Sequence, residues 1–209
     1  MQNHIYEESR GLTIRDLITI GIFSALYFVF NMIGGMPFGI NPVLTFYLPM
    51  GCALLCGPVY MLLVAKVHKR WCITFLGLLM ALIVFVTGMH WGMVVGSVVM
   101  GVLADLVAGA GGYRSIRLDI LSYAVFSLGY TGTYVVYFLN RESWIGSMLD
   151  GGTEQAYIDT MNASAQPWTL PVILLGTAAV ALLSGWLGSL LLRRSEEHTS
   201  ELQSPTSIS

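Results

Sequence analysis

Polar aromatic residues recur at helical spacing along one stretch of this 209-residue chain. Tyr130, Thr133, Tyr134 and Tyr137 stand three or four positions apart, which places their side chains on a single helical face. Aromatic bodies with hydroxyl tips suit a pocket for a small, partly polar molecule. An aromatic belt at a membrane surface explains such residues singly, but belt residues cluster by depth and not along a face.

Other polar and aromatic residues fall at the same predicted end of neighbouring segments. His90 and Trp91 occupy a short turn next to Thr87, where a lone histidine is more often an interfacial residue than a metal ligand. We therefore predict an outward-opening binding pocket and no metal site. Its candidate residues are Asn31, Asn41, Thr45, Thr87, His90, Trp91, Tyr130, Thr133, Tyr134, Tyr137, Asn140, Trp144 and Trp168.

Signatures of catalysis and nucleotide binding are absent from the sequence. It contains no Gly-x-Ser-x-Gly elbow, no Walker A sequence, no His-Glu-x-x-His and no Cys-x-x-Cys. The glycine-rich stretch 109–112 lacks the Lys-Ser/Thr of a phosphate loop, so a tight cytoplasmic turn is favoured. We expect no enzyme activity and no cofactor in this chain.

Asp105 is an acidic residue inside a predicted membrane segment. Burying a carboxylate there costs about 2.5 to 3.5 kcal/mol at the bilayer centre, which makes it a candidate for function. It lies close to the cytoplasmic end, however, where Lys66, Arg114 or Arg117 would satisfy it. Structural anchoring is therefore favoured over a proton relay.

The composition is that of a membrane protein. Apolar residues make up 55% of the chain, charged residues only 11%, and the mean hydropathy is +0.70, whereas soluble domains carry about 25% charged residues. Ten basic residues against twelve acidic ones leave no excess with which to bind nucleic acid. The cysteines, Cys52, Cys56 and Cys72, lie in or beside apolar runs and are predicted to be buried, reduced thiols.

Six segments are long and apolar enough to cross a bilayer, which needs roughly 20 residues of helix. We predict an all-α integral membrane protein, a bundle of six transmembrane helices in the cell membrane. Residues 1–12 form a cytoplasmic segment, without a cleavable signal peptide, and residues 140–167 form a long outer loop. The predicted spans are 13–33, 42–65, 71–88, 91–108, 118–139 and 168–192.

The placement of basic residues sets the orientation. With six helices and a cytoplasmic N-terminus, only Arg141 of the nine basic residues before position 194 falls outside, as the positive-inside rule requires. Splitting the second segment at Gly57-Pro58 would spoil this pattern, so we predict one helix, kinked at Pro58. The basic residues expected inside, with both termini, are Arg10, Arg15, Lys66, Lys69, Arg70, Arg114, Arg117 and Arg193.

The last sixteen residues differ in character from the rest of the chain. Residues 194–209 are polar, and they resemble the translation of a common DNA sequencing adapter. We expect them to be a non-native disordered tail; a genuine polar tail is the alternative. Without them, nine basic and nine acidic residues remain.

Small residues four positions apart mark faces where helix backbones approach closely. Such pairs are Gly21 and Ala25, Gly92 and Gly96, Ser97 and Gly101, Ala181 and Gly185, and Ser184 and Gly188. Internal packing is the favoured interpretation for most. A pair on the first helix that faces lipid would instead suit docking to another membrane protein.

The stretch from Leu12 to Phe28, LTIRDLITIGIFSALYF, resembles the opening of the Trep_Strep family, also called MptD, of energy-coupling factor (ECF) transporter S components. Further similarities are GPVYM at Gly57–Met61, Thr87-Gly88 followed by Trp91, GVLADL at Gly101–Leu106, YAVFSL at Tyr123–Leu128, and Pro167-Trp168 to Pro171. The resemblance covers residues 12–193.

This resemblance implies a six-helix protein that captures a micronutrient outside the cell. In such systems the S component sits on a transmembrane T component, and two cytoplasmic ABC ATPases use ATP to drive its reorientation. Gly21 and Ala25 match the small-residue face that S components use against the T component. Two alternatives stay open. One is a self-sufficient transporter or channel. The other is an intramembrane enzyme that uses Asp105 or His90, although neither residue has a visible nucleophile beside it.

Overall fold

The computed structural model describes the backbone of residues 11–203 and the side chains of residues 11–192 and 194. All regular structure within residues 11–203 is helical, which confirms an all-α fold. The predicted segment 1–12 lies almost wholly outside this range, as does Arg10. The elements are α1 (Ile14–Gly39), η1 (Thr45–Tyr47), α2 (Leu48–Lys66), α3 (Cys72–Val86), α4 (Trp91–Ala110), α5 (Ile116–Ser127), η2 (Leu128–Thr131), α6 (Gly132–Leu139), α7 (Arg141–Asp150), α8 (Gln155–Ser164) and α9 (Thr169–Gln203).

Four helical segments are long and apolar enough to cross a membrane: Ile14–Gly39, Thr45–Lys66, Trp91–Ala110 and Thr169–Leu192. Helix α3 has 15 residues and therefore rises only about 22 Å, less than a hydrocarbon core of about 30 Å. The fifth predicted span is not a single helix, because η2 separates α5 from α6. The chain is thus a multi-pass membrane protein with four crossings evident from length, where the sequence predicted six.

Glycine contacts with α4 accompany the break at η2. A Cβ atom on Gly129 would lie 3.1 Å from the carbonyl oxygen of Gly96, and one on Gly92 would lie 2.8 Å from the carbonyl oxygen of Gly132. Backbones this close leave no room for side chains. The predicted small-residue pair on α4 therefore serves internal packing, and η2 and α6 follow its surface.

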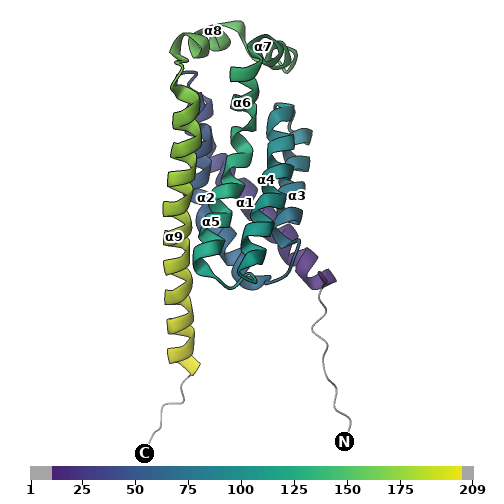
Figure 1. Cartoon of the computed structure of the whole chain (residues 1–209), viewed down its shortest axis with the longest axis vertical. Helices are drawn as coiled ribbons and strands as arrows, with labels where there is room; N and C mark the ends of the chain where they lie inside the picture. The colour runs from purple at the N-terminus through teal and green to yellow at the C-terminus, as the bar shows by residue number, and fades with distance from the viewer. Residues whose placement is uncertain (1–10, 204–209) are drawn as a thin grey trace, which may run out of the picture.

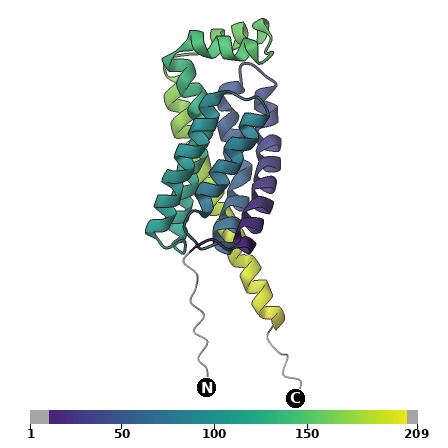
Figure 2. The same ribbon diagram turned by 90° about the vertical axis from the view of Figure 1, so that its right-hand side faces the viewer.

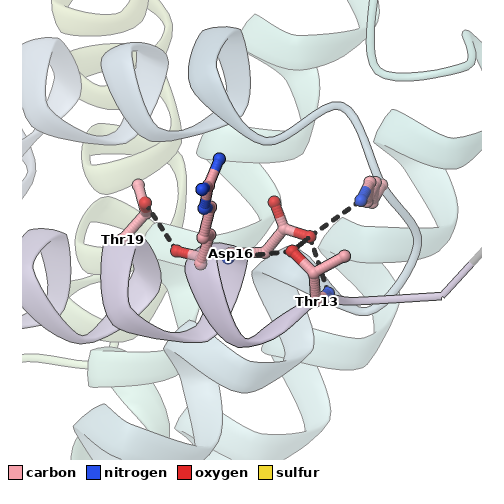
Figure 3. A network of polar contacts seen from close by, with 5 residues as sticks. Thr13, Asp16 and Thr19 are labelled. Carbon is pink, nitrogen blue, oxygen red and sulfur yellow. Dashed lines mark hydrogen bonds and ion pairs between the residues drawn. The ribbon is translucent and has the colours of Figure 1, made fainter. Parts of the chain in front are cut away.

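Helices α1 to α6 and α9 run alongside one another, and the start of α1 lies at the same end of the bundle as the end of α9 (Figure 1). Thr13 and Asp16 form a capping box at the start of α1, seen in Figure 3. The Asp16 carboxylate also forms a 2.8 Å ion pair with Lys69, which ties this end of α1 to the connection between α2 and α3.

Helix α2 runs without interruption through Gly57 and Pro58, as predicted. Proline lacks the N–H that would bond to the carbonyl four residues earlier, here that of Leu54. The Ser184 hydroxyl of α9 donates to that carbonyl at 2.6 Å, which is how membrane helices tolerate proline. Gly57 lies against the same serine, so the proline, the glycine and the serine form one packing unit between α2 and α9.

The predicted outer loop is helical. Helices α7 and α8 lie across the end of the bundle opposite the start of α1 (Figure 2), and we call residues 141–164 the cap. Tyr137 of α6 donates to Asn162 Oδ1 of the cap at 2.7 Å, and its ring packs edge-on against Trp144 of the cap. These contacts hold the cap on the bundle.

Helix α9 continues beyond the expected boundary at residue 193. No glycine or proline stands between Gly188 and Pro205, and the backbone remains helical to Gln203. Residues 194–203 are therefore helical where the sequence predicted a disordered tail, because nothing in them terminates a helix. Residues 204–209 lie outside the described range. The three cysteines are buried and free, as predicted.

Candidate ligand-binding site

A cavity of about 480 Å³ lies between the bundle and the cap. This volume falls in the range of small-molecule sites, about 300 to 1,000 Å³. Its wall comes from α1, the start of α2, the connection between α3 and α4, η2, α6 and the cap. The lining residues are Phe28, Asn31, Met32, Gly35, Met36, Gly39, Ile40, Thr45, Leu48, Cys52, Val84, Thr87, Met89, His90, Met93, Tyr130, Thr133, Tyr134, Trp144, Met148, Thr153, Tyr157 and Met161.

Most polar groups in this wall are already paired with protein atoms. The Trp144 indole donates to Thr133 Oγ1 at 2.9 Å, and the Tyr157 hydroxyl donates to the Gly39 carbonyl at 2.8 Å. The Tyr134 hydroxyl donates to the carbonyl of Thr45. These bonds fasten the cap and α6 to the bundle, so their donors are not free for a ligand.

Three polar atoms of the wall residues are buried and have no partner among the described residues: Asn31 Nδ2, His90 Nε2 and the Tyr130 hydroxyl. The exposed fractions of the three residues are 2%, 7% and 4%. An unpaired buried polar group costs about 1 to 3 kcal/mol. Native proteins pair almost all buried polar atoms, and three of the seven unpaired ones among the described residues belong to this one cavity wall.

Local bonds orient two of these groups. His90 Nδ1 accepts from the Gly92 amide at 3.0 Å at the start of α4, so in the neutral ring Nε2 carries the proton. Burial lowers the pKa of His90 below its usual 6.5 and thereby favours the neutral ring. Asn31 Oδ1 is contacted by Cys52 Sγ at 3.5 Å, and the only group near its amide nitrogen among the described residues is the Cys56 thiol, a weak acceptor.

The structure brings together part of the predicted pocket. Asn31, Thr87, His90, Tyr130, Thr133 and Tyr134 line the cavity, and so do Thr45 and Trp144.

The other predicted pocket residues do not line it, and each has a different environment. Asn41 accepts from the Val43 amide in a turn, and Asn140 caps the start of α7. Tyr137 is buried beneath the cap, where the Arg141 guanidinium stacks 4.9 Å over its ring. Trp91 and Trp168 are more than half exposed, as the aromatic-belt interpretation requires.

Sequence reasoning missed the methionines of the cavity. Six of the eleven methionines line it, and their flexible thioethers adapt to the shape of an apolar ligand. On α1, Phe28, Met32, Met36 and Gly39 recur at helical spacing beside Asn31. That stripe was a usable signal, because it shares a face with Asn31, the one polar residue within 28–39.

Most predicted small-residue pairs serve internal packing. Gly101 of α4 lies against Gly77 of α3, Gly188 against Pro58, and Gly185 against Tyr123. Gly21 is different, because a Cβ atom there would meet nothing within 4 Å. Ala25, on the same face one turn later, is exposed.

Asp105 lies at the opposite end of the bundle from the cavity. Its carboxylate accepts the amides of Trp71 and Ile73, each at 3.0 Å, and the Tyr113 hydroxyl at 3.1 Å. Asp105 thus pairs with backbone amides at the start of α3, where the helix dipole is positive, and not with the predicted cationic side chains. Trp71 and Tyr113 both have positive φ angles, so Asp105 also fixes two strained turns.

A second buried acid was missed. Asp119, in the first turn of α5, is 5% exposed, and its Oδ1 atom has no partner among the described residues. The sequence placed it at a segment boundary, where acids are usually solvated. It does not line the cavity under the cap.

A comparison with protein-family models gives a match over most of the chain. The family model described as hypothetical bacterial integral membrane protein (Trep_Strep) matches residues 14–195. No curated protein and no solved structure matches the chain.

Proposed function

This chain belongs to the Trep_Strep family of bacterial integral membrane proteins, and on that premise we propose that it is the substrate-binding S component of an ECF transporter. In this role it captures a small micronutrient outside the cell. It passes the molecule inward when coupled to a transmembrane T component and two ABC ATPases. The chain itself performs no chemical conversion.

The single observation that carries this proposal is the capped cavity. Its wall is apolar except for a few polar atoms, and Asn31, His90 and Tyr130 each leave one such atom unpaired. Unpaired buried donors cost free energy that a ligand with acceptor atoms would recover. A purely structural bundle would gain stability by replacing them with apolar residues.

We infer six crossings for this role, with α3 as the third and α5, η2 and α6 together as the fifth. Both termini are then cytoplasmic and the cap faces outward. Contacts from Asp16 to Lys69 and from Asp105 to Trp71 and Tyr113 gather the connections near the start of α1 at one end of the bundle. The basic residues of this end are Arg15, Lys66, Lys69, Arg70, Arg114 and Arg117, as the positive-inside rule favours for the cytoplasmic side.

Gly21 and Ala25 are our proposed contact with the T component. They form a small-residue patch on α1 that no other part of the described chain covers, and small residues allow close helix approach. The partner ATPases would consume the ATP, since this sequence has no Walker A motif.

Copurification and transport test this proposal. The chain is expressed with the T component and ATPases of its host, and native mass spectrometry identifies the small molecule that it retains. Uptake of that molecule should require active ATPases. Uptake by this chain alone, undiminished when the ATPases are inactivated, would favour the self-sufficient transporter instead.

Gly21→Leu tests the coupling face. The added side chain should abolish copurification with the T component while leaving ligand retention intact. Phe30→Trp, at an exposed position on the opposite side of the same helix, is the matched control and should copurify normally. Normal copurification of Gly21→Leu would remove this face from the interface.

A further inference from the structure

We propose that the molecule bound under the cap is electrically neutral and largely apolar, and that carbonyl oxygens or ring nitrogens accept its hydrogen bonds. This inference rests on the proposed function and names its substrate class. It follows from which polar atoms of the wall remain unpaired and from which charges the wall lacks.

The unpaired groups are suited to donating. Asn31 Nδ2 carries two N–H groups, and His90 Nε2 carries the ring proton because Nδ1 already accepts from Gly92. The Tyr130 hydroxyl can donate as well. A ligand that presents acceptors would satisfy all three, whereas a ligand that presents only donors would leave the amide and the imidazole N–H groups unpaired.

The remaining polar groups do not reverse this preference. Thr87 donates to carbonyls within α3, and the hydroxyls of Tyr134 and Tyr157 donate to backbone carbonyls. The Thr133 hydroxyl accepts from the Trp144 indole. These groups hold the wall together. The hydroxyls of Thr45 and Thr153, which also line the cavity, can donate as well as accept and therefore do not oppose a ligand that presents acceptors.

Charged ligands are disfavoured because no lysine, arginine, aspartate or glutamate lines this cavity in the described part of the chain. Taking an unpaired ion out of water into such a site costs several kcal/mol. Arg141, on the cap, is stacked over the Tyr137 ring and is absent from the wall. Six methionines and Phe28 supply the rest of the contact, and methionine sulfur packs well against aromatic rings.

The experiment separates ligand classes by charge. Yeast extract is resolved at pH 7 into anionic, cationic and neutral small-molecule fractions, and each is added to the washed protein in detergent during thermal unfolding. We expect the neutral fraction to raise the unfolding temperature. The His90→Phe and Asn31→Leu variants should need at least five-fold more of the neutral fraction to reach the same rise in unfolding temperature. Thr177→Val is the matched control, because it removes a buried, unpaired hydroxyl from a residue that does not line the cavity, and it should need no more of the fraction than the native chain.

The outcomes distinguish the ligand class from the function itself. If the anionic or the cationic fraction carries all the protection, the ligand class is overturned while small-molecule capture stands. If no fraction protects the native chain, the proposed function fails, and the ligand class fails with it. If the neutral fraction protects both variants as well as the native chain, Asn31 and His90 are not its binding groups and the inference is overturned.

Discussion

Tyr130→Phe and Tyr134→Phe make a matched pair of substitutions with opposite expected effects. Both tyrosines line the cavity and are about 4% exposed, and both changes remove one hydroxyl. The Tyr130 hydroxyl has no partner among the described residues, whereas the Tyr134 hydroxyl donates to the Thr45 carbonyl. The two variants therefore differ in whether a protein hydrogen bond is lost.

The magnitudes follow from that difference. Removing an unpaired buried hydroxyl should raise the unfolding free energy of the ligand-free protein by about 1 kcal/mol, since its burial penalty disappears. Removing the paired hydroxyl of Tyr134 leaves the Thr45 carbonyl unsatisfied, and this should lower the unfolding free energy by about 1 to 2 kcal/mol. In a chain of this length, each kcal/mol corresponds to about 2 to 4 °C in unfolding temperature.

Thermal unfolding in detergent, with and without the neutral fraction, measures both effects. Tyr130→Phe should unfold at a higher temperature than the native chain without ligand, yet bind about 2- to 10-fold more weakly, because one hydrogen bond to the ligand is lost. Tyr134→Phe should unfold at a lower temperature. If Tyr130→Phe lowers the unfolding temperature as much as Tyr134→Phe does, the Tyr130 hydroxyl is already paired and the donor argument is refuted.

Three further substitutions probe other parts of the bundle by the same unfolding assay. Ser184→Ala should lower the unfolding free energy of the native chain by about 1 to 2 kcal/mol, because the Leu54 carbonyl loses its donor. In a Pro58→Ala background, where residue 58 regains its N–H, the loss should be much smaller. Equal losses in the two backgrounds would refute the role of the Ser184 hydrogen bond. As the pH falls below about 6.5, the native chain should lose stability relative to His90→Phe, by at most about 1.4 kcal/mol per pH unit. The reason is that burial lowers the pKa of His90, so the unfolded state binds the proton more readily than the folded state. Parallel pH profiles of the two proteins would contradict this. Asp105→Ala should destabilise the protein by about 3 kcal/mol or more, since two amides of α3 lose their acceptor, and an unchanged unfolding temperature would exclude that role.

The sequence predicted the helical class and one wall of the cavity because polarity inside apolar segments is conspicuous. Asn31 and His90 stood out in that way, and Tyr130 and Tyr134 shared a helical face. Tyr137 shares that predicted face but does not line the cavity. The cap covers Tyr137 and bonds to it through Asn162, and the cap's helices could not be anticipated from a segment treated as a loop.

Apolar contributors were harder to find from the sequence for a physical reason. A methionine on a membrane helix has the same hydropathy whether it faces lipid or a cavity, so Met32 and Met36 could be recognised only by the helical face that they share with Asn31. The sequence treated the third span and the segment from α5 to α6 as straight, isolated helices, whereas α3 is shorter and η2 interrupts the second of them. Contacts between Gly96 and Gly129 set the local path there.

The two parts of the site contribute different things. All three unpaired donors belong to the bundle, on Asn31, His90 and Tyr130, whereas the cap's Trp144 and Tyr157 direct their polar hydrogens to bundle atoms. The bundle can therefore select the ligand by its acceptors, while the cap adds apolar contact and excludes water. A substitution in the cap should consequently change how tightly ligands of one class bind, and a substitution among the three donors should change which class binds.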